Sequence, residues 1–520
     1  MSQALPVRDQ GRDQGIFAGT LPPAPPKFKW TRLDTYTWAI IAVFALVTRF
    51  TGLSSATASG TPVFDEKHYV PQAWDMVRSW INPITGGIES NPGYGLVVHP
   101  PLAKQLEALG EWVFGYTPLG WRIMVAIFGT LTIFAIMAIA RRLSGSTMVT
   151  FIAGILALAD GVLLVSSRFG MLDIFLVFFI TAAAWALIRD HQQMHQRLND
   201  LLLTNGQITK DFGPRFGFRW WRFTTGVFLG LALSVKWSGL YYIAFFGLTS
   251  VFLDLWLRKR YGVRRYVTGT LKNDVIPALG SLVIIPALLY IWSWRAWFAS
   301  ETSVYRHAKT DGTITEDSIL QLFPESIAGW IHYHISVLEF HGSLTTSSGH
   351  SHPWDSKPWA WLVSGRPILY FSSTDISCDV GGTCRRMIYL FGTPAIWWLT
   401  VPVILWALWS FFARRSRGYV VPLVAFAAGF LPWLAAYDRQ MYFFYATALV
   451  PFTIIMLALA CGELWGRGKM TPTGLTRGSM AVVTYISLVV MMFLAFSPLF
   501  YGFVIPDYVY ESLMWFPSWR

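Results

Sequence analysis

The sequence predicts an all-α polytopic membrane protein with about eleven transmembrane helices. Of its 520 residues, 54% are hydrophobic and only 13% are charged, whereas about a quarter of the residues in a soluble protein are charged. Apolar runs of about twenty residues recur from Tyr36 to the C-terminus, and each is long enough to cross a hydrocarbon core. The basic residues cluster in short loops beside these runs, where they set orientation.

The predicted spans are residues 36–55, 121–140, 147–166, 172–188, 223–236, 238–256, 275–294, 392–413, 419–436, 441–461 and 479–501. With a cytoplasmic N-terminus, every strongly basic loop, such as Arg258-Lys259-Arg260, falls on the cytoplasmic side. The odd number of spans then places the C-terminus outside.

The gaps between spans divide the chain. Residues 1–35 are polar and Pro-rich, and we expect them to form a disordered cytoplasmic tail. Residues 36–294 form an N-terminal transmembrane module that includes an outer loop at 56–120. Residues 295–391 form a large outer loop, and residues 392–520 form a C-terminal transmembrane module.

The loop at 56–120 contains two segments with the apolar periodicity of amphipathic helices, and we expect both to lie on the membrane surface. Their apolar positions are Val70, Trp74, Val77 and Trp80 in residues 66–80, and Leu102, Leu106, Leu109 and Val113 in residues 102–113.

The net charge of +12 would suit a nucleic-acid partner, but the basic residues lie beside spans, so we expect no nucleic acid. The sequence has no phosphate-binding GxxxxGK[ST] loop and no GxGxxG after a strand, which argues against nucleotide-driven chemistry.

An acidic pair, Asp65-Glu66, lies in the first outer loop beside Phe64 and His68. One carboxylate could act as a general base while the second tunes it or orients a substrate. Taken alone, an acidic helix start with Asp65 as the N-cap explains the pair better. A second motif, His99-Pro100-Pro101-Leu102-Ala103-Lys104, could bring His99 and Lys104 to an anionic ligand, although, taken alone, a plain helix start with a solvated lysine explains it better.

Several charged residues lie at the outer ends of the spans, where an ionisable group is costly and often functional. They are Arg49, Arg122, Arg168, Asp173, Lys236 and Arg439. The basic members could form a phosphate clamp. Snorkelling, or an Arg168–Asp173 ion pair, is the alternative.

The second outer loop is rich in histidine and contains His332, His334, His341, His350 and His352. Their spacing does not match a zinc site, so we expect no metal. Together with Trp354, they more plausibly line a sugar or peptide groove. Cys378 and Cys384 could pair if this loop faces an oxidising compartment.

Together, these motifs resemble those of the protein O-mannosyltransferases, membrane glycosyltransferases of the GT-C class. The matching segments, in order, are Phe64-Asp65-Glu66 with His68, His99 to Lys104, Arg122, Arg168 with Leu172-Asp173, Ser234 to Gly239, and His350 to Pro367. The resemblance covers most of the chain after the N-terminal tail. Residues 295–391 are too few for the MIR domain that eukaryotic members carry there, so the chain looks like a bacterial, actinobacterial-type member of the plasma membrane.

The resemblance implies that a polyprenyl phosphate-linked mannose is transferred, with inversion, to Ser or Thr hydroxyls of exported proteins. Asp65 would be the base and Glu66 its partner, which makes residues 36–294 the catalytic module. Arg122, Arg168 and Lys236 would bind the donor phosphate. His68, His99, Lys104, Asp173, His352 and Trp354 would bind substrate. No cofactor is implied, and the other expected partners are membrane lipids and the protein-export machinery.

Three other functions share some of these features. A related transferase that acts on a lipid or cell-wall glycan would share the acidic pair and the clamp. An oligosaccharyltransferase is disfavoured because the Trp-Trp-Asp-Tyr-Gly motif is absent. A transporter would place charges near the bilayer midplane, whereas here they lie at one end of the spans.

Overall fold

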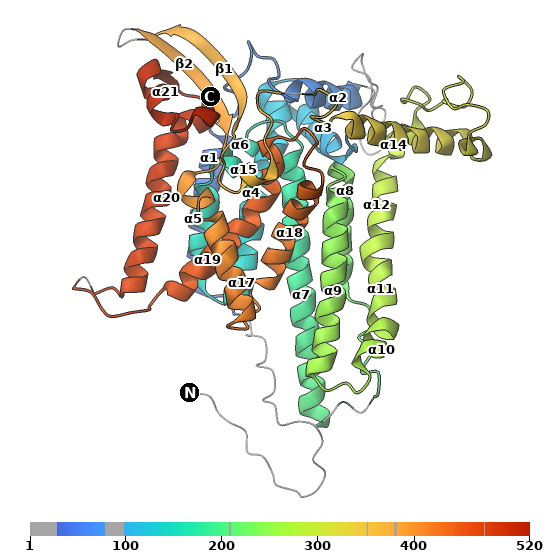
Figure 1. Ribbon diagram of the computed structural model, residues 1–520, viewed down its shortest axis with the longest axis vertical. Coiled ribbons are helices and arrows are strands. Elements are labelled where there is room, and N and C mark those ends of the chain that lie inside the picture. Colours follow the sequence, from blue (N-terminus) through green and yellow to red (C-terminus); the bar gives the residue numbers. More distant parts are fainter. Residues whose placement is uncertain are drawn as a thin grey trace, which may run out of the picture.

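The computed structural model describes residues 29–78, 98–206, 208, 210–350, 352–378, 382–472 and 474–520. Most of these residues are helical, and the long helices form one bundle with a layer of shorter elements over one end (Figure 1). This arrangement confirms the predicted fold class.

The bundle consists of apolar helices, and each of the eleven predicted spans contains at least one of them. In the first half they are α1 (Arg32–Phe50), α4 (Pro118–Ser144), α5 (Thr147–Leu158), α6 (Gly161–Ser166), α7 (Asp173–Asn205), α8 (Trp220–Val235) and α9 (Gly239–Arg260). A continuous helical segment follows, made of α10 (Tyr266–Thr270), η1 (Leu271–Val275), α11 (Ile276–Leu279), η2 (Gly280–Ile284) and α12 (Ile285–Ser293). The second half adds α16 (Pro394–Trp397), α17 (Thr400–Phe412), α18 (Val420–Ala435), η4 (Phe443–Leu449), α19 (Val450–Leu464) and α20 (Arg477–Tyr501).

Within the described ranges, eight helical segments are long and apolar enough to cross a membrane. α5 and α18 are apolar but shorter, and α8 has 16 residues. The 12 residues of α5 extend about 18 Å, and α6 continues the path after Asp160, whose carboxylate caps α6. The number of crossings therefore stays a prediction.

The first span begins earlier than predicted. Thr31 and Asp34 form a capping box, which starts α1 at Arg32 rather than at residue 36. Asp34 is buried and forms an ion pair with Arg141 at 2.8 Å. The predicted tail therefore cannot reach residue 35, and its first 28 residues lie outside the described part of the chain.

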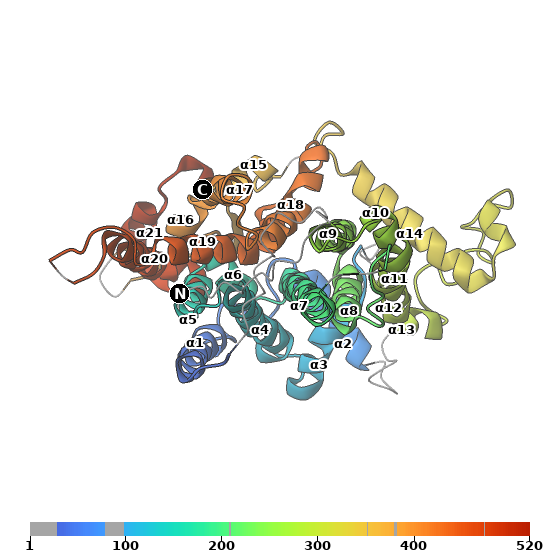
Figure 2. The same ribbon diagram turned by 90° about the horizontal axis from the view of Figure 1, so that it is seen from below.

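The most deeply buried long helices are α7 and α19, which lie towards the middle of the bundle in Figure 2, and α4 packs beside them. These helices contribute residues such as Ile136, Phe175 and Ile454 to one continuous apolar core. Because α7 begins in the middle of this core, residues near its first turn have fixed positions at the outer end of the bundle.

The shorter elements gather at the end that also holds the C-terminus (Figure 1). They are α2 (Glu66–Arg78), α3 (Leu102–Phe114), α13 (Arg295–Ala299), η3 (Ile319–Leu322), α14 (Glu325–Ser343), α15 (Pro358–Trp361), α21 (Asp507–Leu513) and η5 (Pro517–Trp519). The structure confirms helices α2 and α3, although Trp80 lies outside the described residues. The expected apolar face of α3 is divided, because Leu102 is buried while Leu109 and Val113 are exposed.

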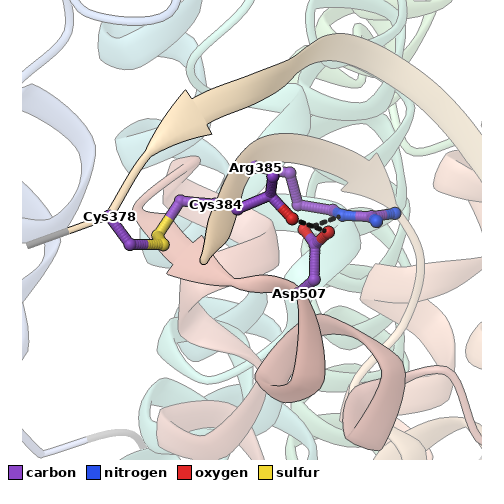
Figure 3. Close-up of a disulfide and its surroundings, with 5 residues drawn as sticks. Cys378, Cys384, Arg385 and Asp507 are labelled. Atoms are coloured by element: carbon purple, nitrogen blue, oxygen red, sulfur yellow. Dashed lines mark hydrogen bonds and ion pairs between the residues drawn. A yellow bond between two sulfur atoms is a disulfide. The ribbon is translucent and has the colours of Figure 1, made fainter. Parts of the chain in front are cut away.

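A small antiparallel sheet lies at the same end and was not part of the all-α prediction. Its strands are β1 (Ile368–Ser377), β2 (Thr383–Leu390) and β3 (Val504–Pro506), in the order β1-β2-β3. A disulfide between Cys378 and Cys384 joins the two strands of the hairpin near its tip (Figure 3). The sequence had left this pairing open.

We predict that one of the three cysteines is a free thiol in the native protein. Cys461 is buried and unpaired, whereas Cys378 and Cys384 are joined. A maleimide added after denaturation without reductant should therefore label one cysteine per chain, and three after reduction, as read by intact-mass spectrometry. Three labels without reductant would contradict the disulfide.

Candidate active site

Asp65 lies at the start of α2, directly after a sharp backbone turn. Phe64 has a φ of +52°, which is uncommon for a residue with a side chain, and its ring stacks on Tyr370 with centroids 4.5 Å apart. The Asp65 carbonyl accepts the Tyr69 N–H as an N-cap residue would, but its carboxylate forms no hydrogen bond with a described side chain. The carboxylate is therefore available for chemistry.

The surroundings of Asp65 favour a base. Burial raises the pKa of the Asp65 carboxyl above its ordinary value, the charges of His68 and Lys236 oppose this shift, and Asp173 adds to it. A carboxylate with a raised pKa accepts a proton more readily than an exposed aspartate does.

Glu66 has a different role from its neighbour. Its carboxylate accepts two hydrogen bonds from Arg122, at 2.7 and 2.8 Å, and one from the Gly170 N–H at 2.8 Å. Both side chains are almost completely buried, at 0% exposure for Glu66 and 1% for Arg122. Because its oxygens are hydrogen-bonded and buried, these contacts favour a positioning role for Glu66 over a direct catalytic one, and the predicted catalytic role stays a prediction.

The contacts of Arg122 do not favour the predicted donor-phosphate role, which stays a prediction. All five N–H groups of its guanidinium donate within the protein, two to Glu66 and three to the carbonyls of Leu53, Ser55 and Ala56. Its planar group lies over the Phe169 ring, 4.5 Å from the centroid. Arg122 therefore holds the loop after α1 and the start of α2 against α4.

Arg168 has a similar structural role, in contrast to its predicted contact with phosphate. Its guanidinium donates to the carbonyls of Thr48, Arg49, Thr51 and Gly52, which lie at the C-terminal end of α1. Carbonyls at a helix C-terminus lack partners within the helix, so a cation there stabilises it.

Asp173 forms an ion pair with Lys236, whereas the sequence had suggested Arg168 as its partner. Lys236 follows α8, and its Nζ lies 2.8 Å from Oδ1 of Asp173, the first residue of α7. The alternative Arg168–Asp173 pair does not form. Both residues line a cavity of about 490 Å³ between α7, α8, α9, α14 and α18, a volume typical of small-molecule sites.

The cavity has one polar end and one apolar side. The polar end contains His99, Asp173, Lys236, His341 and Arg439. The apolar side is lined by Leu176, Leu233, Leu240, Tyr241, Trp433 and Ala448. Asp65 does not line the cavity itself. Phe64, which precedes it, contacts the Phe444 ring, and Lys236 Nζ lies 5.3 Å from the centroid of the same ring, so Asp65 lies near the polar end.

The sequence had named Arg439 as a possible member of a phosphate clamp and His341 as a possible groove residue, but it did not connect the two. Arg439 donates from Nη2 to Nδ1 of His341 at 2.9 Å, and His341 Nε2 faces the carbonyl of Val98 at 3.4 Å. Since arginine can only donate, Nδ1 must carry the lone pair and the imidazole is neutral. Burial and the charge of Arg439 lower the pKa of His341 to about 4, in agreement with that tautomer. No sequence spacing connects the two residues, which are 98 positions apart.

The other predicted substrate residues divide into two groups. His99 lines the cavity, and burial and the charge of Lys236 hold its pKa well below the ordinary value. Lys104 is buried and points back to the His99 carbonyl at 3.3 Å, so it supports this segment rather than reaching a ligand.

His68, His352 and Trp354 do not line the cavity. His68 is exposed beside Asp65. The ring of His352 packs against Tyr442, and Trp354 packs against Tyr389 of β2. Within the described residues, no group of three His, Cys, Asp or Glu side chains could hold a metal ion.

Solved structures with a similar fold are membrane glycosyltransferases. The structure of the Saccharomyces cerevisiae protein O-mannosyltransferase Pmt1-Pmt2 complex bound to the sugar donor aligns with a TM-score of 0.71, over 95% of this chain and 93% of that chain, at 16% identity. ArnT from Cupriavidus metallidurans bound to undecaprenyl phosphate aligns with a TM-score of 0.52, over 90% and 77% of the two chains, at 15% identity. The fold is therefore that of the GT-C membrane glycosyltransferases.

The sequence comparisons identify the family. Residues 118–299 match the model for dolichyl-phosphate-mannose-protein mannosyltransferase, and residues 326–519 match the C-terminal four-transmembrane region of protein O-mannosyltransferase. The chain is 44% identical to the polyprenol-phosphate-mannose–protein mannosyltransferase of Mycolicibacterium smegmatis (strain MKD8), over 93% of this chain and 92% of the relative. The chain belongs to the protein O-mannosyltransferase family.

We predict that removing either member of the Glu66–Arg122 pair destabilises the protein. Glu66→Gln or Arg122→Met should each cost about 3–5 kcal/mol, because each leaves buried polar groups unpaired. The double variant should cost less than the sum of the two. Thermal unfolding in detergent measures these effects.

The half-exposed pair Arg385–Asp507 provides the control. Asp507→Asn should cost no more than about 1 kcal/mol. A phosphate-binding role for Arg122 would instead raise the KM for the donor in Arg122→Met while its unfolding temperature stayed at the wild-type value.

Proposed function

We propose that the protein transfers mannose from polyprenyl phosphate-mannose to Ser and Thr hydroxyls of exported proteins, outside the membrane and with inversion. The supporting observation is a desolvated carboxylate, Asp65, that has no hydrogen-bond partner among the described side chains and lies beside a cavity with a cationic end and an apolar side. The mycobacterial relatives that match most of the chain are named for the same donor class and a protein acceptor.

The donor fits the cavity in one orientation. Its phosphate lies at the polar end, where Lys236 and Arg439 supply positive charge and neutral His341 holds the Arg439 guanidinium in place. Its first isoprene units lie along Leu233, Leu240 and Trp433. A phosphate in this position directs the anomeric carbon towards the side on which Asp65 lies.

Transfer then needs one base and one anion-binding group. Asp65 accepts the proton of the acceptor hydroxyl as its oxygen bonds to C1 of mannose on the face opposite the phosphate. The C1–O bond to the phosphate breaks, and its electron pair leaves on the phosphate oxygen. Positive charge at Lys236 and Arg439 stabilises this departing anion, so no acid is required.

The orientation of the chain follows from charge and from the disulfide. Basic residues lie in the last turns of α4 and α9, at the end of the bundle opposite the sheet, as in a cytoplasmic face. The Cys378–Cys384 disulfide suits an oxidising compartment, where disulfides form and persist. We therefore place the N-terminus in the cytoplasm and the C-terminus outside, in the plasma membrane, where the protein contacts lipids and receives acceptors from the export machinery.

A related transferase acting on a lipid or cell-wall glycan is the second candidate, because the acidic residue and the cavity are common to both. Incubation of membranes with labelled polyprenyl phosphate-mannose and a Ser/Thr-rich peptide separates them. Label in the peptide supports the proposal, and label only in lipid or glycan contradicts it.

Asp65→Asn should lower mannosyl transfer at least about a hundredfold, because the amide cannot accept the hydroxyl proton. The variant should still accumulate in the membrane and bind the donor. In the wild type, turnover should rise with pH through an apparent pKa above that of an exposed aspartate, since the base works deprotonated. Near-normal turnover by the variant would exclude Asp65 as the base.

Transfer should survive EDTA, since the proposed mechanism uses fixed cationic side chains where other enzymes use a divalent ion. Initial rates with and without chelator should agree within about twofold. A complete loss of activity that one divalent ion restores would contradict the metal-free mechanism.

A further inference from the structure

The outer sheet has one anchored side and one free edge. On the anchored side, β2 pairs with β3, Arg385 forms an ion pair with Asp507 at 2.7 Å, as Figure 3 shows, and Thr383 donates to the same carboxylate at 2.6 Å. On the other side, no strand among the described residues pairs with the second edge of β1.

An unpaired strand edge presents a row of N–H and C=O groups to any extended chain. Proteins usually protect such edges with lysine, proline or bulges. The sequence of β1, ILYFSSTDIS, contains neither lysine nor proline. Two register shifts in its pairing with β2, between Leu369 and Phe371 and between Ser373 and Ile376, interrupt the edge as bulges do. The regular segment that remains between them is short and consists of Phe371, Ser372 and Ser373.

This segment begins beside the candidate base. Tyr370, the residue directly before it, stacks on Phe64, which precedes Asp65. Tyr370 is buried, whereas Ser372 and Thr374 are exposed. In an extended chain, residues two or three positions apart are separated by about 7–10 Å. A chain that pairs with this segment could therefore place a residue at Asp65 two or three positions beyond the paired part.

The hairpin is also held in one conformation. The disulfide joins its strands near the tip, and Arg386 donates to the Gly502 carbonyl at 2.7 Å. A fixed edge loses little conformational freedom when a chain binds to it, which favours binding.

We propose that the free edge of β1 at Phe371–Ser373 binds the acceptor polypeptide as an added β-strand and delivers its Ser or Thr to Asp65. The recognition is through main-chain hydrogen bonds and therefore accepts many sequences. The short pairing also limits affinity, so a mannosylated product can leave. This inference rests on the proposed function, because it takes a polypeptide as the acceptor.

Acceptor peptides with single N-methylated residues test the pairing. The full chain in nanodiscs receives polyprenyl phosphate-mannose and a peptide that contains one serine. N-methylation removes one N–H donor, so it should lower kcat/KM about tenfold where that donor pairs with β1. The sensitive positions should lie two to four residues from the serine, on one side of it only, and should alternate with insensitive ones. Equal rates for all N-methyl peptides would overturn the inference.

Photo-crosslinking measures binding of the peptide independently of mannose transfer. A benzophenone amino acid replaces Ser372 in one variant and the exposed Tyr508 of α21 in a control. The first should crosslink to the peptide without donor, and excess unlabelled peptide should compete; the control should not crosslink. Equal crosslinking by both variants, or none at position 372, would contradict edge binding. If position 372 crosslinks but the peptide receives no mannose from the wild type, the proposed function fails and edge binding stands.

Discussion

The buried ion pair between Glu66 and Arg122 fixes the geometry on which the rest of the site depends. Through it, α2 is joined to α4, to the loop after α1 and to the Gly170 N–H in the turn before α7. Asp173 lies three residues after that turn and holds Lys236. One buried pair therefore helps to place Asp65, the proposed base, near the cationic end of the cavity.

Two adjacent carboxylates thus have different roles because their environments differ. Glu66 accepts charge-assisted hydrogen bonds and is permanently occupied, whereas Asp65 is desolvated without a hydrogen-bonding partner among the described side chains. The positive φ at Phe64 helps to separate them, since it turns the backbone immediately before the pair. The Asp65 carboxylate can accept a proton, and the hydrogen-bonded Glu66 carboxylate keeps Asp65 in position.

The sequence predicted the helical bundle and the location of the chemistry, because apolar run length and charge placement are local signals. It could not distinguish basic residues that bind other parts of the protein from basic residues that line the cavity. Arg122, Arg168 and Lys236 all lie at outer helix ends, and only their tertiary partners show that the first two serve backbone carbonyls and Glu66. Arg439 and His341 meet across 98 positions, and β2 pairs with β3 across more than a hundred, so neither contact leaves a local pattern.

The most direct test of this account is an experimental structure of the Asp65→Asn protein with polyprenyl phosphate-mannose bound. The account predicts that the phosphate contacts Lys236 and Arg439, that C1 of mannose faces residue 65, and that Arg122 still pairs with Glu66. A phosphate bound to Arg122 or Arg168, with the Glu66 pair broken, would contradict it.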